Sequence, residues 1–364
     1  MGKCTMPVCD LSVGTPDLPP AKHIVEAFQK SASDMENYKY ALADTEELTD
    51  AAVEWYGRRF SVNLERANVC GLIGSQDGLA HLPLMVLNPG DRIMIPNPGY
   101  PMFLTGARLS SADIIYTPLS EDRGYLVDYE AISPTVAHSA KMLIVSYPAN
   151  PLGRLAPMEF FEKTVWFAKK YDICVIHDNA YVELVYDGAE GHSFLEAKGA
   201  ADVGVEFNSL SKSYNLTGAR ISFMLGNADI CAALSRLKSN IDYGIFKPVQ
   251  AMAVAAITGP QSCLTDLRAE YQLRRDALCS ALSEGGWDID PPQGTMFAWA
   301  KLPERHRDSL KFTLELLKNT GVALVPGISF GSLGEGHVRI GLVKPAGEIA
   351  GAARKIARFV TIHG

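Results

Sequence analysis

Several kinds of segment are missing from this sequence of 364 residues. No apolar run reaches the roughly 18 residues that are needed to cross a bilayer, and the residues after Met1 lack the hydrophobic core of a signal peptide. The 34 basic and 41 acidic residues give a net charge of −7, without any lysine or arginine run that would bind nucleic acid or an anionic membrane. We therefore expect a cytoplasmic protein with neither nucleic acid nor a membrane as its partner.

Cysteine is scattered along the chain. The seven cysteines are an odd number without a C-x-x-C pair, and no histidine stands at zinc-binding spacing. They are Cys4, Cys9, Cys70, Cys174, Cys231, Cys263 and Cys279. The sequence therefore predicts neither a disulfide framework nor a metal site. Internal repeats are missing too, and 47% apolar residues supply a sizeable core, so a globular enzyme is expected.

Two apolar runs end in polar residues. Residues 141–147 lead to Asn150, residues 173–176 lead to His177 and Asp178, and a helical segment at 157–171 lies between the runs. This order predicts an α/β fold with a mostly parallel sheet, in which ligands bind beyond the carboxyl ends of the strands. Asn150 and Asp178 are therefore candidate site residues, although Asp178 could also cap a helix or bind a metal. His177 is interpreted as structural and receives no role.

Further signals lie in the C-terminal third. A helical pattern at residues 262–284 ends at Gly285-Gly286, and residues 321–328 are interpreted as a strand of a smaller C-terminal domain. Gly331, Gly334 and Gly336 are not followed by a helix, so their segment is interpreted as a loop.

A glycine-rich segment at residues 70–79 turns from a strand into a helix. Such a turn points free backbone N–H groups and the positive end of the helix dipole at one place, where a phosphate would fit. The segment is neither a G-x-G-x-x-G motif nor a P-loop. We expect the side chain of Asp77 to turn away from the phosphate, for example to cap the helix.

Residues 209–220, Ser-Leu-Ser-Lys-Ser-Tyr-Asn-Leu-Thr-Gly-Ala-Arg, are the stretch around which the chain is organised. The amine of Lys212 can condense with an aldehyde, while nearby hydroxyls and the Arg220 guanidinium can neutralise a phosphate. Pyridoxal 5'-phosphate (PLP) carries both groups. Ser209 and Lys212 also satisfy the S-x-x-K pattern of serine acyl enzymes, but their K-[ST]-G strand is missing and Ser213-Tyr214-Asn215 lies beside the nucleophile instead of far along the chain. A serine acyl enzyme is kept as a remote alternative.

These motifs, from about Asp10 to Leu342, resemble the fold-type I PLP-dependent aminotransferases of the aspartate aminotransferase superfamily. Residues 240–246 resemble a loop of its alanine and LL-diaminopimelate aminotransferase branch. The resemblance implies an α/β fold of this type: a large PLP-binding domain with a mostly parallel sheet flanked by helices, at residues 36–262, and a smaller α/β domain formed by residues 1–35 and 263–364.

The resemblance also implies a role for each matching residue. Lys212 would form the Schiff base and shuttle the proton, Asp178 would hold the pyridine nitrogen, and Tyr181 would hold the 3'-oxygen. The cofactor would further contact Ser75, Gln76, Tyr100, Asn150, Ser209, Ser211 and Arg220. Gly14 and Arg339 would bind the substrate carboxylate, Arg339 through two parallel hydrogen bonds. Asn150 would contact the substrate as well as the 3'-oxygen of the cofactor.

Tyr40 matches a tyrosine that reaches the phosphate of the neighbouring subunit, which implies a homodimer with shared sites. A tyrosine that packs in its own domain is the alternative. The function implied is an aminotransferase that moves an amino group between an α-amino acid and a 2-oxo acid in a ping-pong cycle. Two competing functions are a PLP-dependent β-lyase or replacement enzyme on the same scaffold and a noncatalytic PLP-binding protein.

Overall fold

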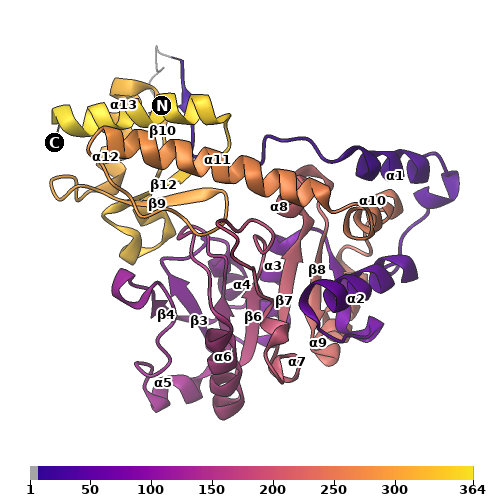
Figure 1. The fold of residues 1–364 in the computed structure, drawn as a ribbon. Helices are drawn as coiled ribbons and strands as arrows, with labels where there is room; N and C mark the ends of the chain where they lie inside the picture. The colour runs from indigo at the N-terminus through magenta and orange to yellow at the C-terminus, as the bar shows by residue number, and fades with distance from the viewer. Residues whose placement is uncertain (1–6, 364) are drawn as a thin grey trace.

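The computed structural model describes residues 7–363, so Cys4 lies outside the described residues. A sheet of seven strands in the order β2-β8-β7-β6-β5-β3-β4 forms the centre of the larger part of the molecule (Figure 1). Only β8 runs against the other six strands. The predicted α/β fold with a mostly parallel sheet is confirmed. The strands are β2 (Val69–Leu72), β3 (Arg92–Asn97), β4 (Asp113–Pro118), β5 (Ala140–Val145), β6 (Cys174–Asp178), β7 (Gly204–Ser209) and β8 (Ser222–Gly226).

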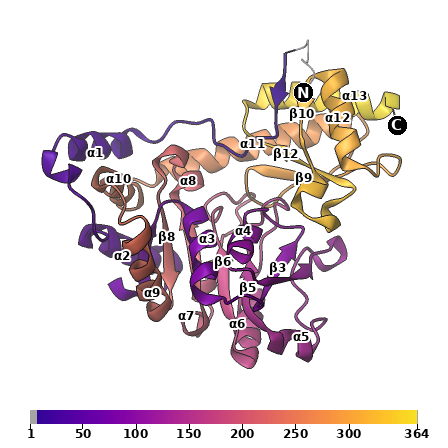
Figure 2. The ribbon, with the colours of Figure 1, turned by 180° about the vertical axis from the view of Figure 1, so that it is seen from behind.

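Helices bury both faces of this sheet. In β5, Met142 and Ile144 pack with residues of α3, α4 and α9, whereas Leu143 and Val145 pack with residues of α2 and α6. Figure 2 shows α3, α4 and α9 in front of the sheet, and Figure 1 shows α2 and α6 in front of it. A strand buried on both faces reads as a continuous apolar run, as β5 does. The helices are α1 (Lys22–Ala32), α2 (Glu46–Phe60), α3 (Ser75–Val86), α4 (Phe103–Leu109), α5 (Pro134–Ser139), α6 (Met158–Tyr171), α7 (Ala200–Val203), α8 (Leu210–Ser213), α9 (Ala228–Ile241), α10 (Lys247–Thr258), α11 (Ser262–Glu284), α12 (Ser309–Thr320) and α13 (Ala346–His363).

The C-terminal third forms a second core beside the first. Strands β11 (Val325–Pro326), β12 (His337–Gly341) and β9 (Phe297–Lys301) make an antiparallel sheet, and β1 (Cys9–Asp10) pairs with β10 (Val322–Ala323). Helix α11 occupies the predicted residues 262–284 and runs from α10 to α13 (Figure 1). None of the helices within residues 7–363 has the length and apolar character that crossing a membrane requires.

The sequence interpretation of the last strands is corrected by the structure. Residues 321–328 were expected to form one strand, but β10 pairs with β1 while β11 pairs with β12, so neighbouring residues enter two different sheets. The glycine-rich segment that follows, expected as a loop, contains short 3₁₀ turns at Gly327–Phe330 and Ser332–Gly334. A Cβ on Gly327 would lie 1.9 Å from the carbonyl oxygen of Gly334, so this close backbone contact requires glycine.

Candidate active site

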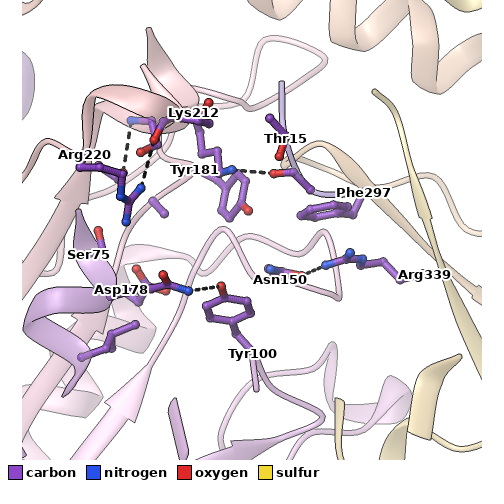
Figure 3. Close-up of a pocket in the computed structure, with 17 residues that line it drawn as sticks. Thr15, Ser75, Tyr100, Asn150, Asp178, Tyr181, Lys212, Arg220, Phe297 and Arg339 are labelled. Atoms are coloured by element: carbon purple, nitrogen blue, oxygen red, sulfur yellow. Dashed lines mark hydrogen bonds between the residues drawn. The ribbon is translucent and has the colours of Figure 1, made fainter. Parts of the chain in front are cut away.

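A cavity of about 470 Å³ lies at the carboxyl end of the parallel strands, between the two cores (Figure 3). The folding chain brings together all but one of the site residues expected from the sequence. Those that line the cavity are Gly14, Ser75, Gln76, Tyr100, Asn150, Asp178, Tyr181, Ser209, Ser211, Lys212, Arg220 and Arg339. Tyr40 is the exception.

Lys212 enters the cavity from the short helix α8, directly after β7. Its Nζ donates a 2.6 Å hydrogen bond to the carbonyl oxygen of Gly14. Burial lowers the pKa of Lys212 to about 8, and the positive charges of Arg220 and Arg339 add to this effect. About a tenth of this amine is therefore uncharged and nucleophilic at pH 7, far more than for an ordinary lysine. Gly14 lines the cavity, and its expected contact with a substrate carboxylate stays a prediction.

An anion-binding corner is formed where the N-terminus of α3 meets Arg220. Gly74, the residue before the helix, has φ +76°, and a Cβ placed on it would lie 2.3 Å from an Nη atom of Arg220. The guanidinium therefore lies directly against this glycine. The Ser75 hydroxyl is buried and has no hydrogen-bond partner in the protein. Backbone N–H groups, a hydroxyl and a guanidinium at one place match the donors that a phosphate requires.

Asp77 turns away from this corner, as expected. Its carboxylate pairs with the buried ammonium of Lys238 on α9, accepts a hydrogen bond from the N–H of Ile73 and contacts the Nδ1 of His81. Ile73 precedes α3, so this hydrogen bond holds the segment before the helix. Asp77 therefore does not act as an ordinary N-cap, whose side chain accepts from an N–H of the first helical turn. The negative charge of Asp77 is thus neutralised by Lys238 and kept out of the anion-binding corner.

Asp178 stands at the end of β6 with its carboxylate in the cavity. The residue is buried, and its Oδ1 has no hydrogen-bond partner in the protein. Desolvation raises the pKa of Asp178 to about 6, against the opposing influence of His177. Burying a carboxylate oxygen without a hydrogen-bond partner costs free energy of folding. The Oδ1 of Asp178 is therefore suited to accept a hydrogen bond from a cationic or donor group of a ligand.

Aromatic side chains shape the neighbouring walls. Tyr181 is buried, and desolvation raises its pKa far above the ordinary value. The Nε2 of Gln76 donates a 3.0 Å hydrogen bond to the hydroxyl of Tyr100. Gln76 therefore lines the cavity as expected, while its amide also positions the Tyr100 ring.

Arg339 projects from β12 into the cavity from the C-terminal core. Its Nη1 donates to the Oδ1 of Asn150 at 3.1 Å, its Nη2 donates to the carbonyl oxygen of Ser12 at 2.8 Å, and its Nε has no protein partner. The guanidinium carbon lies 3.9 Å from the ring centroid of Phe297. Within residues 7–363 no acidic side chain forms a salt bridge with it. Burial lowers the pKa of Arg339 to about 10, and a carboxylate ligand would compensate this buried charge.

The sequence reasoning missed Phe297. This residue stacks on Arg339 and lines the cavity. Phe297 comes close to Arg339 because its strand, β9, pairs with β12. In the sequence, the only indication of a role for Phe297 was its place in an apolar strand of the same predicted domain. Thr15, Leu79, Ala180 and Thr217 also line the cavity without having been singled out.

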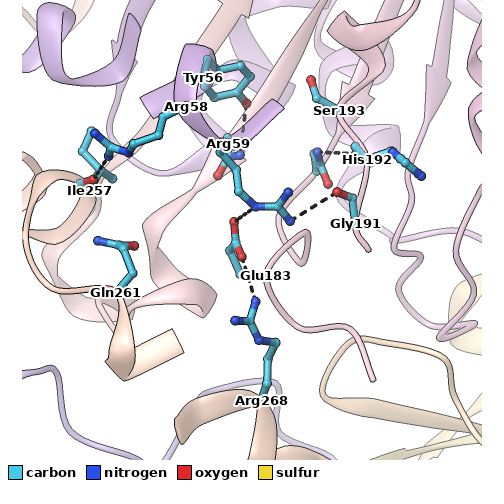
Figure 4. A network of polar contacts seen from close by, with 12 residues as sticks. Tyr56, Arg58, Arg59, Glu183, Gly191, His192, Ser193, Ile257, Gln261 and Arg268 are labelled. Carbon is cyan, nitrogen blue, oxygen red and sulfur yellow. Dashed lines mark hydrogen bonds and ion pairs between the residues drawn. The ribbon is translucent and has the colours of Figure 1, made fainter. Parts of the chain in front are cut away.

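The loop that carries Tyr181 is fixed by a buried acid (Figure 4). The side chain of Glu183 is only 2% exposed and is paired with Arg59 of α2 at 3.0 Å and with Arg268 of α11 at 3.3 Å. The Nη2 of Arg59 also reaches the carbonyl oxygen of Gly191. The position of the Tyr181 loop is therefore held by two helices that are distant in sequence.

Tyr40 lies outside the cavity. Its side chain is 82% exposed and its ring centroid is 5.5 Å from that of Tyr243. Other large apolar side chains around it are exposed as well. We call this surface the aromatic edge, and it consists of Met35, Tyr38, Tyr40, Leu42, Ile241, Tyr243 and Phe246.

Comparisons with known proteins agree over nearly the whole chain. The family model described as "Aminotransferase class I and II" matches residues 7–356. The LL-diaminopimelate aminotransferase of Dehalococcoides mccartyi is 41% identical over 97% of this chain and 91% of its own length. The glutamate-pyruvate aminotransferase AlaC of Escherichia coli is 40% identical over 98% of this chain and 88% of its own.

Solved structures give the same result. Substrate-bound BacF from Bacillus subtilis superposes with a TM-score of 0.94 at 35% identity, covering 97% of this chain and 90% of its own. A probable N-succinyldiaminopimelate aminotransferase from Thermus thermophilus has a TM-score of 0.92 at 39% identity, covering 97% of this chain and 95% of its own. Both likenesses extend over the two cores that enclose the cavity.

Proposed function

Because the chain belongs to the aminotransferase class I and II family, it is an enzyme that transfers amino groups, and we propose that it does so with PLP held at Lys212. One observation carries this proposal. The amine of Lys212, the unpartnered carboxylate of Asp178 and the anion-binding corner at Arg220 all face one cavity. An aldehyde, a basic ring nitrogen and a phosphate on one small molecule would satisfy all three.

The residues present fit this cofactor. The phosphate would be held by Arg220, the α3 N-terminus and the hydroxyls of Ser75, Ser209 and Ser211. Asp178 would pair with the ring nitrogen, Tyr181 and Asn150 would hold the ring oxygen, and Tyr100 would cover the ring. When bound, PLP draws electrons from the substrate α-carbon and carries the amino group between the two half-reactions.

The protein side chains supply positioning and proton transfer. Lys212, with a pKa near 8, is suited to take a proton from the substrate α-carbon and return it, because a general base is most effective near the working pH. Arg339 would orient the substrate through its carboxylate, with Phe297 and Asn150 fixing the guanidinium. An ionised Asp178 would keep the ring nitrogen protonated.

Borohydride reduction tests the assignment of Lys212. Treating the PLP-loaded protein with borohydride should leave a covalent cofactor adduct on the peptide that contains Lys212, detected by mass spectrometry. Lys212→Ala should abolish the adduct, whereas Lys22→Ala should keep it because Lys22 is a surface residue paired with Glu26. An adduct on another lysine in the wild-type protein would remove Lys212 from this role.

The competing functions receive less support from the site. A serine acyl enzyme would need Lys212 near the Ser209 hydroxyl, but the amine is bonded to Gly14 and the Ser209 hydroxyl accepts from the N–H of Ser211. Acylation of Ser209 by a β-lactam would revive that possibility. A β-lyase would release ammonia together with the keto acid, so assaying both products separately distinguishes it from an aminotransferase.

We propose α-amino acids and 2-oxo acids as the substrates. The similar proteins carry the names of LL-diaminopimelate, glutamate-pyruvate and glutamine aminotransferases, and their amino-acid substrates share the α-carboxylate that Arg339 is placed to bind. A panel of amino acids, followed by the absorbance change of the bound cofactor and by keto-acid release, would identify the substrate. An amine without a carboxylate is the matched control.

We also propose a homodimer in which the aromatic edge meets its copy and Tyr40 reaches the neighbouring phosphate. Its support is the exposure of Tyr40 and of the apolar side chains around it. The division into a large domain at 36–262 and a small one at 1–35 and 263–364 stays a prediction, as does the cytoplasmic location. The separate core of the C-terminal third supports the division, while α1 packs against α10 of the larger part.

A further inference from the structure

His177 precedes Asp178 on β6 and has no part in the site described above. Successive residues of a strand point to opposite faces of the sheet. Asp178 therefore faces the cavity, while the imidazole of His177 is fully buried behind it. There the ring contacts Phe161 and Phe194, with ring centroids 4.9 and 6.3 Å away. A histidine in such an apolar place needs partners for both ring nitrogens.

Both nitrogens of His177 face hydrogen-bond acceptors. The Nε2 lies 2.9 Å from the carbonyl oxygen of Tyr147, which can only accept, so the Nε2 carries a hydrogen. The Nδ1 lies 2.8 Å from the Oε2 of Glu206 on β7. The protonation of Nδ1 therefore depends on whether Glu206 is a carboxylate.

The surroundings of Glu206 are those of a carboxylate. Its Oε2 accepts from the N–H of Phe194 at 2.7 Å and from the Ser193 hydroxyl at 2.9 Å. Its Oε1 accepts from the Tyr56 hydroxyl at 2.6 Å, and that hydroxyl in turn accepts from Asn208. Although burial raises the pKa of Glu206, hydrogen bonds from His177, Tyr56 and Asn179 lower it below the ordinary value. Nδ1 must then donate to Glu206, which makes the ring an imidazolium.

We propose that His177 is a buried imidazolium, held by Glu206 and the Tyr147 carbonyl, and that it acts as a positioning residue whose charge keeps Asp178 ionised toward the cavity. The role toward Asp178 rests on the proposed function, but the protonation of His177 does not. The cation is the residue next to Asp178 on β6. Glu206 is the neighbour of His177 on the adjacent strand β7, and the two side chains pair on the face of the sheet that is turned away from the cavity. Desolvation favours the neutral acid of Asp178, and the imidazolium opposes it.

Other ionisable groups also surround Asp178. Those that face it across the cavity are Tyr100, Tyr181, Lys212, Arg220 and Arg339. The last three are cations whose proposed ligands are the cofactor aldehyde, its phosphate and the substrate carboxylate. Ligand binding would compensate or neutralise each of these charges, whereas the imidazolium behind the sheet does not contact the ligand. His177 therefore supports the ionised form of Asp178 throughout the reaction cycle.

Nuclear magnetic resonance of the full-length protein freed of cofactor tests the protonation directly. With ¹⁵N-labelled histidine, both ring nitrogens of His177 should carry protons at pH 7. In Glu206→Gln the side-chain amide would donate to Nδ1, so under the same conditions His177 should carry a proton on Nε2 only. Tyr56→Phe is the matched control, because it removes an uncharged donor from the same carboxylate and should leave His177 doubly protonated. A single ring proton on wild-type His177 at pH 7 would overturn the proposal.

The effect on Asp178 is measured in the same samples from its ¹³C carboxyl signal. The titration midpoint should rise by about one pH unit in His177→Asn, and by less in Glu206→Gln, which removes both charges together. Tyr56→Phe should leave it in place. An unchanged midpoint in the charge-removing variants would refute the electrostatic role, and if His177→Asn does not fold, Glu206→Gln carries the test. Failure to bind PLP at Lys212 would contradict the proposed function while leaving both titrations valid.

Discussion

At the scale of single residues, Lys212 shows how burial and neighbouring charge set reactivity. Its pKa of about 8 means that the uncharged fraction rises about tenfold between pH 7 and pH 9, from about a tenth to about nine tenths of the amine. We predict that the rate of PLP capture by the cofactor-free protein rises by that factor and then levels off. Stopped-flow absorbance would measure it. A rate that keeps climbing tenfold per unit through pH 10 would show an ordinary lysine.

Arg339 tests geometry separately from charge. In Arg339→Lys the positive charge stays but the planar fork is lost, so kcat/KM for amino acids should fall about 10- to 100-fold, the value of one charged hydrogen bond. The fall should appear with the 2-oxo acid as well. PLP affinity should be unchanged, because the phosphate corner is formed by other residues.

The control for Arg339 is a substrate that has nothing to place in the fork. A simple amine without a carboxylate should react slowly with the wild-type enzyme and lose little further activity in Arg339→Lys. Arg123 is exposed, so Arg123→Lys is a matched control substitution. It should leave the reaction rates with the amino acid and with the amine unchanged. Equal losses with amino acid and amine would show that Arg339 serves the structure only.

The site residues were predictable where a local motif carried them. Lys212, Arg220, Asp178 and Asn150 each stand at the end of a strand or in a short motif, and the structure brings them into one cavity. Phe297 could not be found this way, because its role comes from the pairing of β9 with β12. The hydrogen bond from Lys212 to the Gly14 carbonyl also escapes any local pattern, since 198 residues separate its two ends.

At the scale of elements, the ion pair of Lys238 and Asp77 joins α9 to the first turn of α3. Lys238 is 4% exposed and also contacts Asp242. Lys238→Met would leave a buried carboxylate without its cation, so we predict a loss of about 3–5 kcal/mol in the free energy of unfolding. Chemical denaturation would measure it. Lys22→Met, at an exposed ion pair, should cost less than about 1 kcal/mol.

The pH dependence of this effect follows from the Lys238 pKa. Burial lowers that pKa, but the hydrogen bonds to Asp77 and Asp242 outweigh it and raise the pKa above the ordinary value of a lysine. The ion pair therefore contributes fully at neutral pH and is lost only as the pH rises through the folded-state pKa. A difference between wild type and Lys238→Met that already vanished at pH 8 would contradict this account.

Elements with a strong periodic signal were predicted well, and the short ones were not. The apolar run of β5 and the long helix α11 correspond to the predicted segments because many residues repeat one pattern. Strands β10 and β11 contain two residues each and are defined by their partners instead of by their own sequence. A strand of two residues is too short to show an alternating pattern, so its sequence cannot reveal which sheet it joins.

At the scale of the whole molecule, we predict that the protein is a dimer with a mass twice the 39.5 kDa of the chain. Subunit complementation tests the sharing of sites. Lys212→Ala and Tyr40→Ala should each impair activity, and unfolding and reassembling the two variants together should restore part of it. In the mixed dimer, one site would combine an intact Lys212 with an intact Tyr40.

The outcome separates the two interpretations of Tyr40. If this residue acts in its own subunit, the mixed dimer contains no intact site and activity stays low. Mixing Lys212→Ala with Asp178→Asn is the control, because both residues line the same cavity of one chain and cannot complement each other. A monomer by light scattering would reject the shared site altogether.

The pairing of β1 with β10 has a consequence for synthesis. Arg339 bonds to the carbonyl of Ser12, which lies 327 residues earlier, so the substrate side of the cavity needs both ends of the chain. The wall that holds Lys212 and Asp178 lies on residues that leave the ribosome much sooner. We therefore expect a nascent chain to form its phosphate corner first and to gain its substrate clamp only near the end of translation. Arrested chains of increasing length, probed for PLP capture, would reveal that order.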